Sequence, residues 1–155
     1  MGLIKGVSLQ KLESIQGGMA QFYTPQSSDE TMLVQVPSGT IDELFVHRFQ
    51  TDQILVVRGS FILVALHNKE YQYIPLSEDE PQVVTIPPGV PHGAINLGSK
   101  DCLMVNAVLR HGESHPLDYR PMKPPFPYDF SKVNCLVEDL SQLNYESKKE
   151  AALIQ

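Results

Sequence analysis

The most informative stretch of the sequence is IPPGVPHGAIN, residues 86–96. An apolar run, residues 83–86, leads into two prolines and a glycine, and because proline fixes φ and lacks a backbone N–H, a strand is expected to end there. Gly89 can adopt the backbone conformation that such a turn needs. A second short strand then begins at His92, and since side chains alternate across a strand, His92 and Asn96 lie on the same face. We expect this face to form the wall of a polar pocket.

The composition limits the class of protein. A chain of 155 residues, 42% hydrophobic and 19% charged, is typical of one globular domain with a sizeable core. The net charge of −6 and the lack of a basic stripe argue against a general nucleic-acid binder. No apolar run approaches membrane-spanning length and no signal-peptide pattern is visible, so we expect a cytoplasmic protein that does not enter membranes. The spacing of Cys102 and Cys135 suggests neither a disulfide framework nor a zinc knuckle.

Short apolar runs separated by turn residues predict an all-β fold. The chain has twelve prolines and ten glycines, and two long apolar runs, residues 54–57 and 61–66, are joined through Arg58-Gly59-Ser60. We interpret these two runs as a hairpin at the centre of a sandwich or barrel. Closure into a small barrel, or into two facing sheets, removes exposed sheet edges. The other predicted strands are residues 31–36, 41–49, 71–75, 83–86, 92–96 and 102–109.

The chain is expected to fold as a single domain with three parts. Residues 1–30 form an N-terminal arm with an edge strand, residues 31–110 form the β-barrel, and residues 111–155 form a proline-rich wrap and a short C-terminal helix. The wrap is predicted to follow an extended path over the outside of the barrel, and the helical composition is clearest in residues 147–154. The aromatic and histidine side chains of the wrap are expected to pack on the outer face or to be solvated: Tyr119, Phe126, Tyr128, His111 and His115.

The pattern Pro-x-Gly-x-x-His-x-x-x-Asn, at Pro87, Gly89, His92 and Asn96, resembles the second signature motif of the cupin superfamily. The resemblance implies a small cupin-type β-barrel or jelly roll, also described as a double-stranded β-helix. It also implies a homodimer, because similar cupins commonly pair through their sheets.

The first cupin motif supplies His-x-His and then Glu, which join the histidine of the second motif on a metal ion. In this sequence His47 matches the first position, Phe49 stands at the second histidine, and Gln53 falls at the acidic position. The resemblance therefore implies His47, Gln53 and His92 as candidate ligands. Because an amide binds divalent cations poorly, the site holds either a weakly bound divalent metal or none. Asp52 contributes only if the register shifts and its side chain turns inward.

Residues 41–109 also resemble the metal-free branch of the superfamily, the dTDP-4-dehydrorhamnose 3,5-epimerases (RmlC-like cupins). The similarity lies in the apolar hairpin sequence around Gly59 and in the Pro-x-Gly-x-x-His-Gly turn that ends at Gly93. In that family a histidine on the strand before the hairpin is the general base, and His47 is the matching position. A base that removes a proton next to a ketone needs a pKa near neutrality, which histidine has.

Three departures from the epimerase pattern affect the expected mechanism. The family's lysine before the hairpin corresponds to Asp52, and the reversed charge opposes a developing oxyanion. The acid tyrosine of the strand after His92 is missing, and Val105 or Asn106 occupies its position. Residues 17–22 contain no arginine to hold a nucleotide diphosphate. We therefore expect the fold to be shared without the 3,5-epimerase mechanism.

Two functions follow from the sequence. The first is an isomerase- or epimerase-like enzyme of a small sugar-like or keto-acid-like metabolite, with His47 and His92 as catalytic groups. The alternative is a non-catalytic cupin that senses or binds a small molecule in the same pocket, and a barrel filled with aromatic side chains would favour a purely structural role. The partner expected in the first two cases is a small-molecule ligand. The residues expected to bind it are Asn96, Gln53, Phe49 and Phe45.

Overall fold

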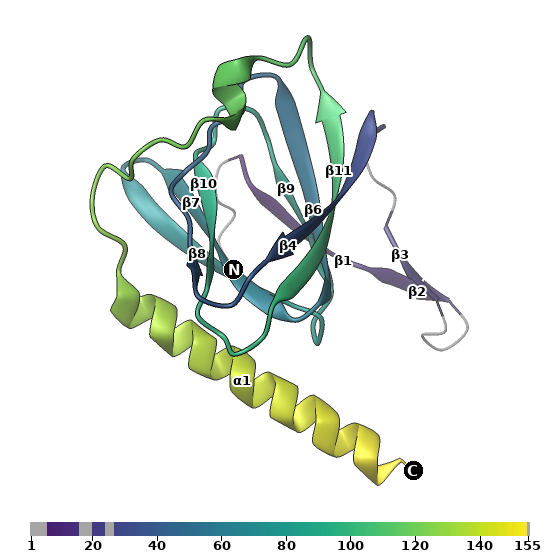
Figure 1. The fold of residues 1–155 in the computed structure, drawn as a ribbon. Helices are drawn as coiled ribbons and strands as arrows, with labels where there is room; N and C mark the ends of the chain where they lie inside the picture. The colour runs from purple at the N-terminus through teal and green to yellow at the C-terminus, as the bar shows by residue number, and fades with distance from the viewer. Residues whose placement is uncertain (1–5, 16–19, 24–26, 155) are drawn as a thin grey trace.

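The computed structural model of the chain describes residues 6–15, 20–23 and 27–154. Two antiparallel sheets face each other around the core, and a long helix lies across the outside of one of them (Figure 1). The architecture is a small jelly roll. The predicted all-β fold is confirmed.

The larger sheet has five strands and the smaller sheet has four. The order in the larger sheet is β1 (Ser8–Lys11), β9 (Gln82–Ile86), β6 (Gln50–Arg58), β11 (Cys102–Arg110) and β4 (Glu30–Val36). The order in the smaller sheet is β5 (Thr40–Ile41), β10 (His92–Asn96), β7 (Ser60–His67) and β8 (Glu70–Ser77). A separate ribbon consists of β2 (Glu13–Ile15) and β3 (Ala20–Phe22). Five predicted strands correspond to β4, β8, β9, β10 and β11.

The core lies between the inner faces of the two sheets. Because side chains alternate along a strand, every second residue of β6 and β7 points inward and the two sets interdigitate. Phe61 is the largest of these side chains and is 2% exposed. Other members of this core are Val36, Ile54, Val56, Leu63, Ala65, Leu76, Val84, Ile86 and Met104.

The two apolar runs predicted as a hairpin do not pair with each other. β6 pairs with β9 and β11 in the larger sheet, whereas β7 pairs with β8 and β10 in the smaller one. The chain crosses between the sheets at Gly59, where φ is +82° and an added Cβ would lie 2.8 Å from the carbonyl oxygen of Asp101. The hairpin prediction is wrong because two apolar runs around a glycine are equally compatible with a corner between sheets.

The predicted strand at residues 41–49 is also wrong in its length. Only its beginning belongs to a strand, β5, and the rest makes two isolated bridges, from Leu44 to Met122 and from Phe45 to His92. Leu44 and Phe45, although consecutive, therefore pair with two different segments of the chain, so no continuous hydrogen-bond ladder forms. The segment lies directly against β10, because a Cβ added at Gly93 would be 2.5 Å from the Glu43 carbonyl oxygen.

The C-terminal helix α1 spans Phe130–Leu153 and, at 24 residues, is much longer than the short helix predicted. The Asp129 side chain accepts a hydrogen bond from the Lys132 N–H and caps its first turn. Val133 is fully buried and packs with Ile62 and Val64 of β7, on the outer face of the smaller sheet. The first half of the helix escaped prediction because its Ser, Val, Asn and Cys residues have low helix propensity, and packing on the sheet compensates.

The N-terminal part of the chain supplies one edge of the larger sheet. β1 pairs with β9 in the register Ser8 to Thr85, so the segment predicted as an arm contains an edge strand of the larger sheet. The predicted arm also includes residues 1–5, 16–19 and 24–26, which lie outside the described residues. The division of the domain at residues 30 and 110 remains a prediction. Within the described ranges, no helix combines the length and the apolar character needed to cross a membrane.

The crossing between the sheets predicts the relative stability of two glycine variants. Gly39→Ala places a side chain at φ +84° with nothing within 4 Å, whereas Gly59→Ala adds a contact with the Asp101 carbonyl at a similar φ. We expect Gly39→Ala to lose about 1–2 kcal/mol of unfolding free energy from backbone strain alone. Gly59→Ala should lose clearly more. Urea denaturation measures both, and equal losses would show that the close approach at Gly59 is unimportant.

Candidate active site

His92 is the first residue of β10, directly after the proline turn. Its Nδ1 lies 2.9 Å from the carbonyl oxygen of Val90. A carbonyl oxygen can only accept a hydrogen bond, so Nδ1 carries the proton in this contact. Nε2, the other ring nitrogen, therefore points into the interior as the atom available for chemistry. The local turn thus fixes both the position and the tautomer of this histidine.

Asp52 lies on β6, on the same inward face as Ile54, and is 2% exposed. Its Oδ1 accepts hydrogen bonds from Gln50 Nε2 at 2.6 Å and from Asn106 Nδ2 at 2.9 Å. Burial raises the pKa of this carboxyl, but hydrogen bonding and charge from His92, with the bonds from Asn106 and Gln50, lower it to about 2. Asp52 is therefore ionised at neutral pH.

His47 lies in the irregular segment before β6, and its side chain is 11% exposed. Its backbone carbonyl accepts a hydrogen bond of 2.8 Å from the Gly89 N–H, which fastens this segment to the proline turn. Burial lowers the His47 pKa below its usual 6.5, and the negative charge of Asp52 opposes the shift without cancelling it. His47 is therefore mostly neutral at pH 7.

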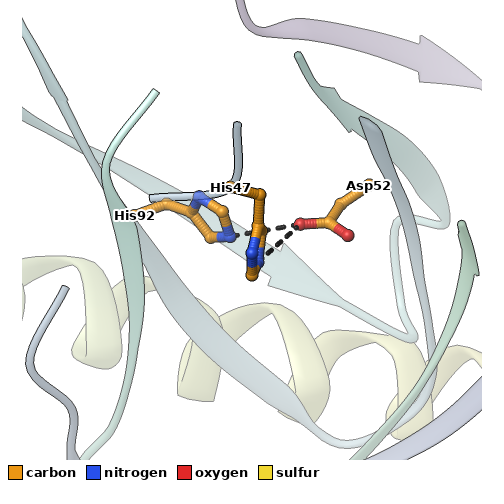
Figure 2. A group of neighbouring side chains, drawn as sticks. All are labelled: His47, Asp52 and His92. Carbon is orange, nitrogen blue, oxygen red and sulfur yellow. Dashed lines mark ion pairs between the residues drawn. The ribbon is translucent and has the colours of Figure 1, made fainter. Parts of the chain in front are cut away.

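The three side chains converge on one point (Figure 2). Asp52 Oδ2 lies 3.2 Å from His92 Nε2 and 3.5 Å from His47 Nε2. The two imidazole rings meet edge to face with centroids 5.2 Å apart. The convergence follows from the two sheets: β6 begins beside the ends of β9 and β11, with Asp52 opposite Ile86, and the proline turn leads from the end of β9 directly to His92 at the start of β10. We refer to this end of the jelly roll as the barrel mouth.

The arrangement requires a positive charge between the carboxylate and His92. With Nδ1 donating to Val90, a neutral His92 ring would direct the lone pair of Nε2 at an ionised carboxylate oxygen, and two acceptors at this distance repel. Either a proton on Nε2 or a metal ion removes the conflict. Two imidazole nitrogens and a carboxylate oxygen, all within 4.8 Å of one another, are also a donor set that divalent transition metals accept. The residues therefore fit a metal ion as well as a proton.

The structure brings His47 and His92 together but not Gln53, the third predicted metal ligand. Gln53 follows Asp52 on β6, so its side chain points to the opposite face of the sheet. There it is 2% exposed, and its Nε2 donates to the Ala107 carbonyl at 3.0 Å. The carboxylate that faces the histidines is that of Asp52.

The other three predicted pocket residues do not join the group. Asn96 donates to the carbonyl oxygens of Val36 and Lys100 and so holds the far end of β10 in place. Phe45 is half-buried and exchanges two backbone hydrogen bonds with His92. Phe49 is 41% exposed. The wrap contains two histidines. His111 contacts Thr51 Oγ1 at 2.7 Å, and His115 caps the 3₁₀ turn that follows it.

Sequence reasoning missed a set of polar residues at the barrel mouth. Tyr119, expected on the outer face, is the last residue of a 3₁₀ turn, Pro116–Tyr119, and its ring centroid lies 5.9 Å from that of His47. Phe126 and Tyr128 do lie outside, where they pack against Tyr71. Gln50, Arg110 and Asn106 also belong to this set of polar residues, and none of them lies in a recognisable sequence motif. Asp52 carries no clear signal either, because residues 54–57 are apolar at every position and do not show which face of β6 points inward.

Comparison with known proteins identifies the fold. No family model and no curated protein matches the sequence. A dTDP-4-dehydrorhamnose 3,5-epimerase from Sulfolobus tokodaii is 18% identical, with 81% of this chain and 85% of that chain covered and a TM-score of 0.61. The chain has the cupin fold. The resemblance predicted from the sequence is thus confirmed at the level of the cupin fold.

Two further solved structures support this fold over most of the chain. A dTDP sugar isomerase from Desulfovibrio desulfuricans is 20% identical, covering 83% of this chain and 92% of its own, with a TM-score of 0.62. A mutant sugar 3,4-ketoisomerase from Thermoanaerobacterium thermosaccharolyticum, in complex with TDP-4-keto-6-deoxyglucose, is 12% identical, covering 90% and 97%, with a TM-score of 0.59. At these identities the likeness concerns the fold, and the activity must be argued from the site.

The site predicts how the His47 pKa responds to its neighbour. Because the charge of Asp52 raises the His47 pKa against the effect of burial, Asp52→Asn should lower it further below the wild-type value. NMR titration of the imidazole Hε1 signal measures the shift. Asp79→Asn is the matched control, since Asp79 bonds to Asn144 of α1 and not to the site. An unchanged or raised His47 pKa in Asp52→Asn would contradict the described geometry.

Proposed function

We propose that this protein is an isomerase- or epimerase-like enzyme that moves a proton on a carbon next to the carbonyl of a small keto sugar. The observation that supports this proposal is the convergence of His47 and His92 on one buried carboxylate, Asp52, at the barrel mouth. Buried imidazoles beside a carboxylate are groups that accept and return protons near neutral pH.

His47 acts as the general base. Its lowered pKa leaves the ring neutral at pH 7, so it can accept a proton. A proton taken up by the ring gives an imidazolium whose Nε2 lies 3.5 Å from Asp52 Oδ2, and the buried negative charge stabilises it. Hydrogen bonds from Gln50 and Asn106 to the same carboxylate reduce the cost of burying it.

The solved structures with the same fold favour sugars as the substrate class. They are described as a dTDP-4-dehydrorhamnose 3,5-epimerase, a dTDP sugar isomerase and a sugar 3,4-ketoisomerase, and reactions of this kind move protons next to a sugar carbonyl. The alternative is a cupin that binds such a ligand without converting it. The test therefore measures binding and turnover separately.

The proposal predicts exchange of the substrate hydrogen next to the carbonyl. Nucleotide-linked and free keto sugars incubated in D₂O should lose this hydrogen in the NMR spectrum when wild-type protein is present. His47→Asn should slow the exchange by about 100-fold or more, the usual contribution of a general base. The control is His111→Asn, because His111 contacts Thr51 and lies outside the His47–Asp52–His92 group.

The rate of hydrogen exchange should also depend on pH through the protonation of His47. The base must be unprotonated, so the rate should be level at pH 7–8 and should fall as the pH drops through the His47 pKa, below 6.5. A ligand that binds with no exchange over hours would support the non-catalytic alternative. Full activity in His47→Asn would refute His47 as the base.

The facing acceptors on Asp52 and His92 favour a second candidate, a metal-assisted enzyme of the same substrate class. His47, Asp52 and His92 would hold the ion, and a divalent metal there would polarise a sugar carbonyl as a Lewis acid. The three ligands replace the predicted set, with Asp52 in place of Gln53. Their partial burial limits access of water to the site.

This second candidate predicts metal content. Elemental analysis of protein purified without chelator should find close to one divalent ion per chain, and the Asp52→Asn and His92→Ala variants should lose it. Gln53→Ala, one residue away on the opposite face, should lose metal only if it unfolds, which circular dichroism would detect. Absence of metal in wild-type protein reconstituted with zinc, manganese or iron(II) would exclude this candidate and leave the proton between Asp52 and His92.

A further inference from the structure

We infer that the protein has a second binding site, for a sugar phosphate, in a cleft at the end of the jelly roll opposite the barrel mouth. The cleft has a volume of about 920 Å³, within the range of about 300–1,000 Å³ that small-molecule sites occupy. Its walls are residues 58–60 at the crossing between the sheets, residues 77–79 at the end of β8, residues 98–101 between β10 and β11, and side chains of α1 from residues 140–148. We refer to it as the basal cleft.

The basal cleft is separate from the three buried side chains of the barrel mouth. Asp52 and Arg58 lie on the same strand, β6, and six residues of extended chain span about 20 Å. In Figure 1 the 3₁₀ turn of the barrel mouth lies at the top of the molecule, and the turn between β10 and β11 lies at the bottom, beside α1. A ligand in the basal cleft therefore does not contact His47, Asp52 or His92, and the inference does not depend on the proposed function.

Three cationic side chains of the basal cleft are available to an anion. Arg58 is the last residue of β6, Lys100 lies in the turn before β11, and Lys148 lies in the second half of α1. All three are exposed, and in the part of the chain that the structure describes none of them forms an ion pair with a carboxylate. An anion that binds to them therefore displaces no existing ion pair. Arginine and lysine are the side chains that bind phosphate in proteins.

The carboxylates of the basal cleft are held by donors of the protein itself. Glu78 Oε1 accepts a hydrogen bond of 3.1 Å from the Gly59 N–H, and Asp101 Oδ1 accepts one of 2.9 Å from the Ser38 N–H. These bonds to the backbone fix both carboxylates at the ends of strands. Because each carboxylate has further lone pairs, it can also accept hydrogen bonds from the hydroxyl groups of a ligand.

The helical wall of the basal cleft is fixed to the jelly roll. Asp79 Oδ2 accepts a hydrogen bond of 3.1 Å from Asn144 Nδ2, which ties α1 to the end of β8. Asn144 and Lys148 are four residues apart, so they lie on the same face of the helix, and both line the cleft. Lys148 therefore extends into the cleft from a regular helix that is already in place, which lowers the entropic cost of binding a ligand there.

This lining matches the chemistry of a sugar phosphate. The guanidinium and the two ammonium groups neutralise a phosphate group, whereas the fixed carboxylates and the hydroxyls of Ser60 and Ser99 bond to sugar hydroxyls. An apolar ligand would bury these polar groups without partners, which is costly. Inorganic phosphate would fill only a small part of a cleft of about 920 Å³.

The test follows backbone amide signals of ¹⁵N-labelled protein by NMR during titration with glucose 1-phosphate. We expect saturable shifts at Gly59, Gly98 and Ser99, which line the basal cleft, and no shift at Gly93, next to His92 in β10. The binding should weaken as sodium chloride is added, because the cations are exposed to solvent.

Two variants test the cations. Lys148→Ala and Arg58→Ala should each weaken the binding of glucose 1-phosphate by about 10-fold, since each loses a charge-assisted hydrogen bond. The matched control is Lys149→Ala, which removes the same charge from the next residue of α1, outside the cleft lining, and should bind as wild type does. All three side chains are exposed, so the fold should be retained, and the amide spectra verify this.

Four results would overturn the inference. The first is the absence of any shift at millimolar glucose 1-phosphate, and the second is a set of shifts confined to Gly93 and its neighbours, which would place the ligand at the barrel mouth. The third is an affinity of Lys148→Ala and Arg58→Ala equal to that of Lys149→Ala. The fourth is inorganic phosphate binding as tightly as glucose 1-phosphate, which would show that the sugar is not recognised.

Discussion

The buried carboxylate of Asp52 is the group on which the rest of the site depends. A single ionised side chain in the interior of a small jelly roll is costly unless its oxygens are bonded and its charge is balanced. Gln50 and Asn106 satisfy one oxygen, and the two imidazoles face the other. The same charge limits the fall of the His47 pKa and requires a proton or a cation at His92.

The fold brings these groups together through close contacts of backbone with backbone. The segment that carries His47 lies against β10 because Gly93 has no side chain. The backbone carbonyl of His47 accepts a hydrogen bond from the Gly89 N–H of the proline turn. The corner at Gly59 sends β6 and β7 into different sheets, so that Asp52 on one sheet faces His92 on the other. The glycines recognised in the sequence as turn residues thus position the chemistry as well as the strands.

The sequence predicts what depends on local chemistry and misses what depends on distant contacts. The turn and β10 follow from prolines and a glycine, so His92 was found, and a motif position identified His47. Asp52 lies one residue off the acidic position of the motif, and the apolar run that follows it does not show which face of β6 points inward. Tyr119 reaches the barrel mouth only because a 3₁₀ turn folds the proline-rich wrap over that end. No sequence pattern predicts the resulting contact between Tyr119 and His47.

A ¹³C NMR titration of the Asp52 side-chain carboxyl carbon in the folded protein tests the central arrangement of the site. We expect Asp52 to remain ionised as the pH falls from neutrality past 3.8, the pKa of an unperturbed aspartate, because its pKa in the folded protein is lowered to about 2. A titration midpoint at or above 3.8 would show that the imidazoles and amides do not stabilise this carboxylate, and would contradict the central arrangement of the site.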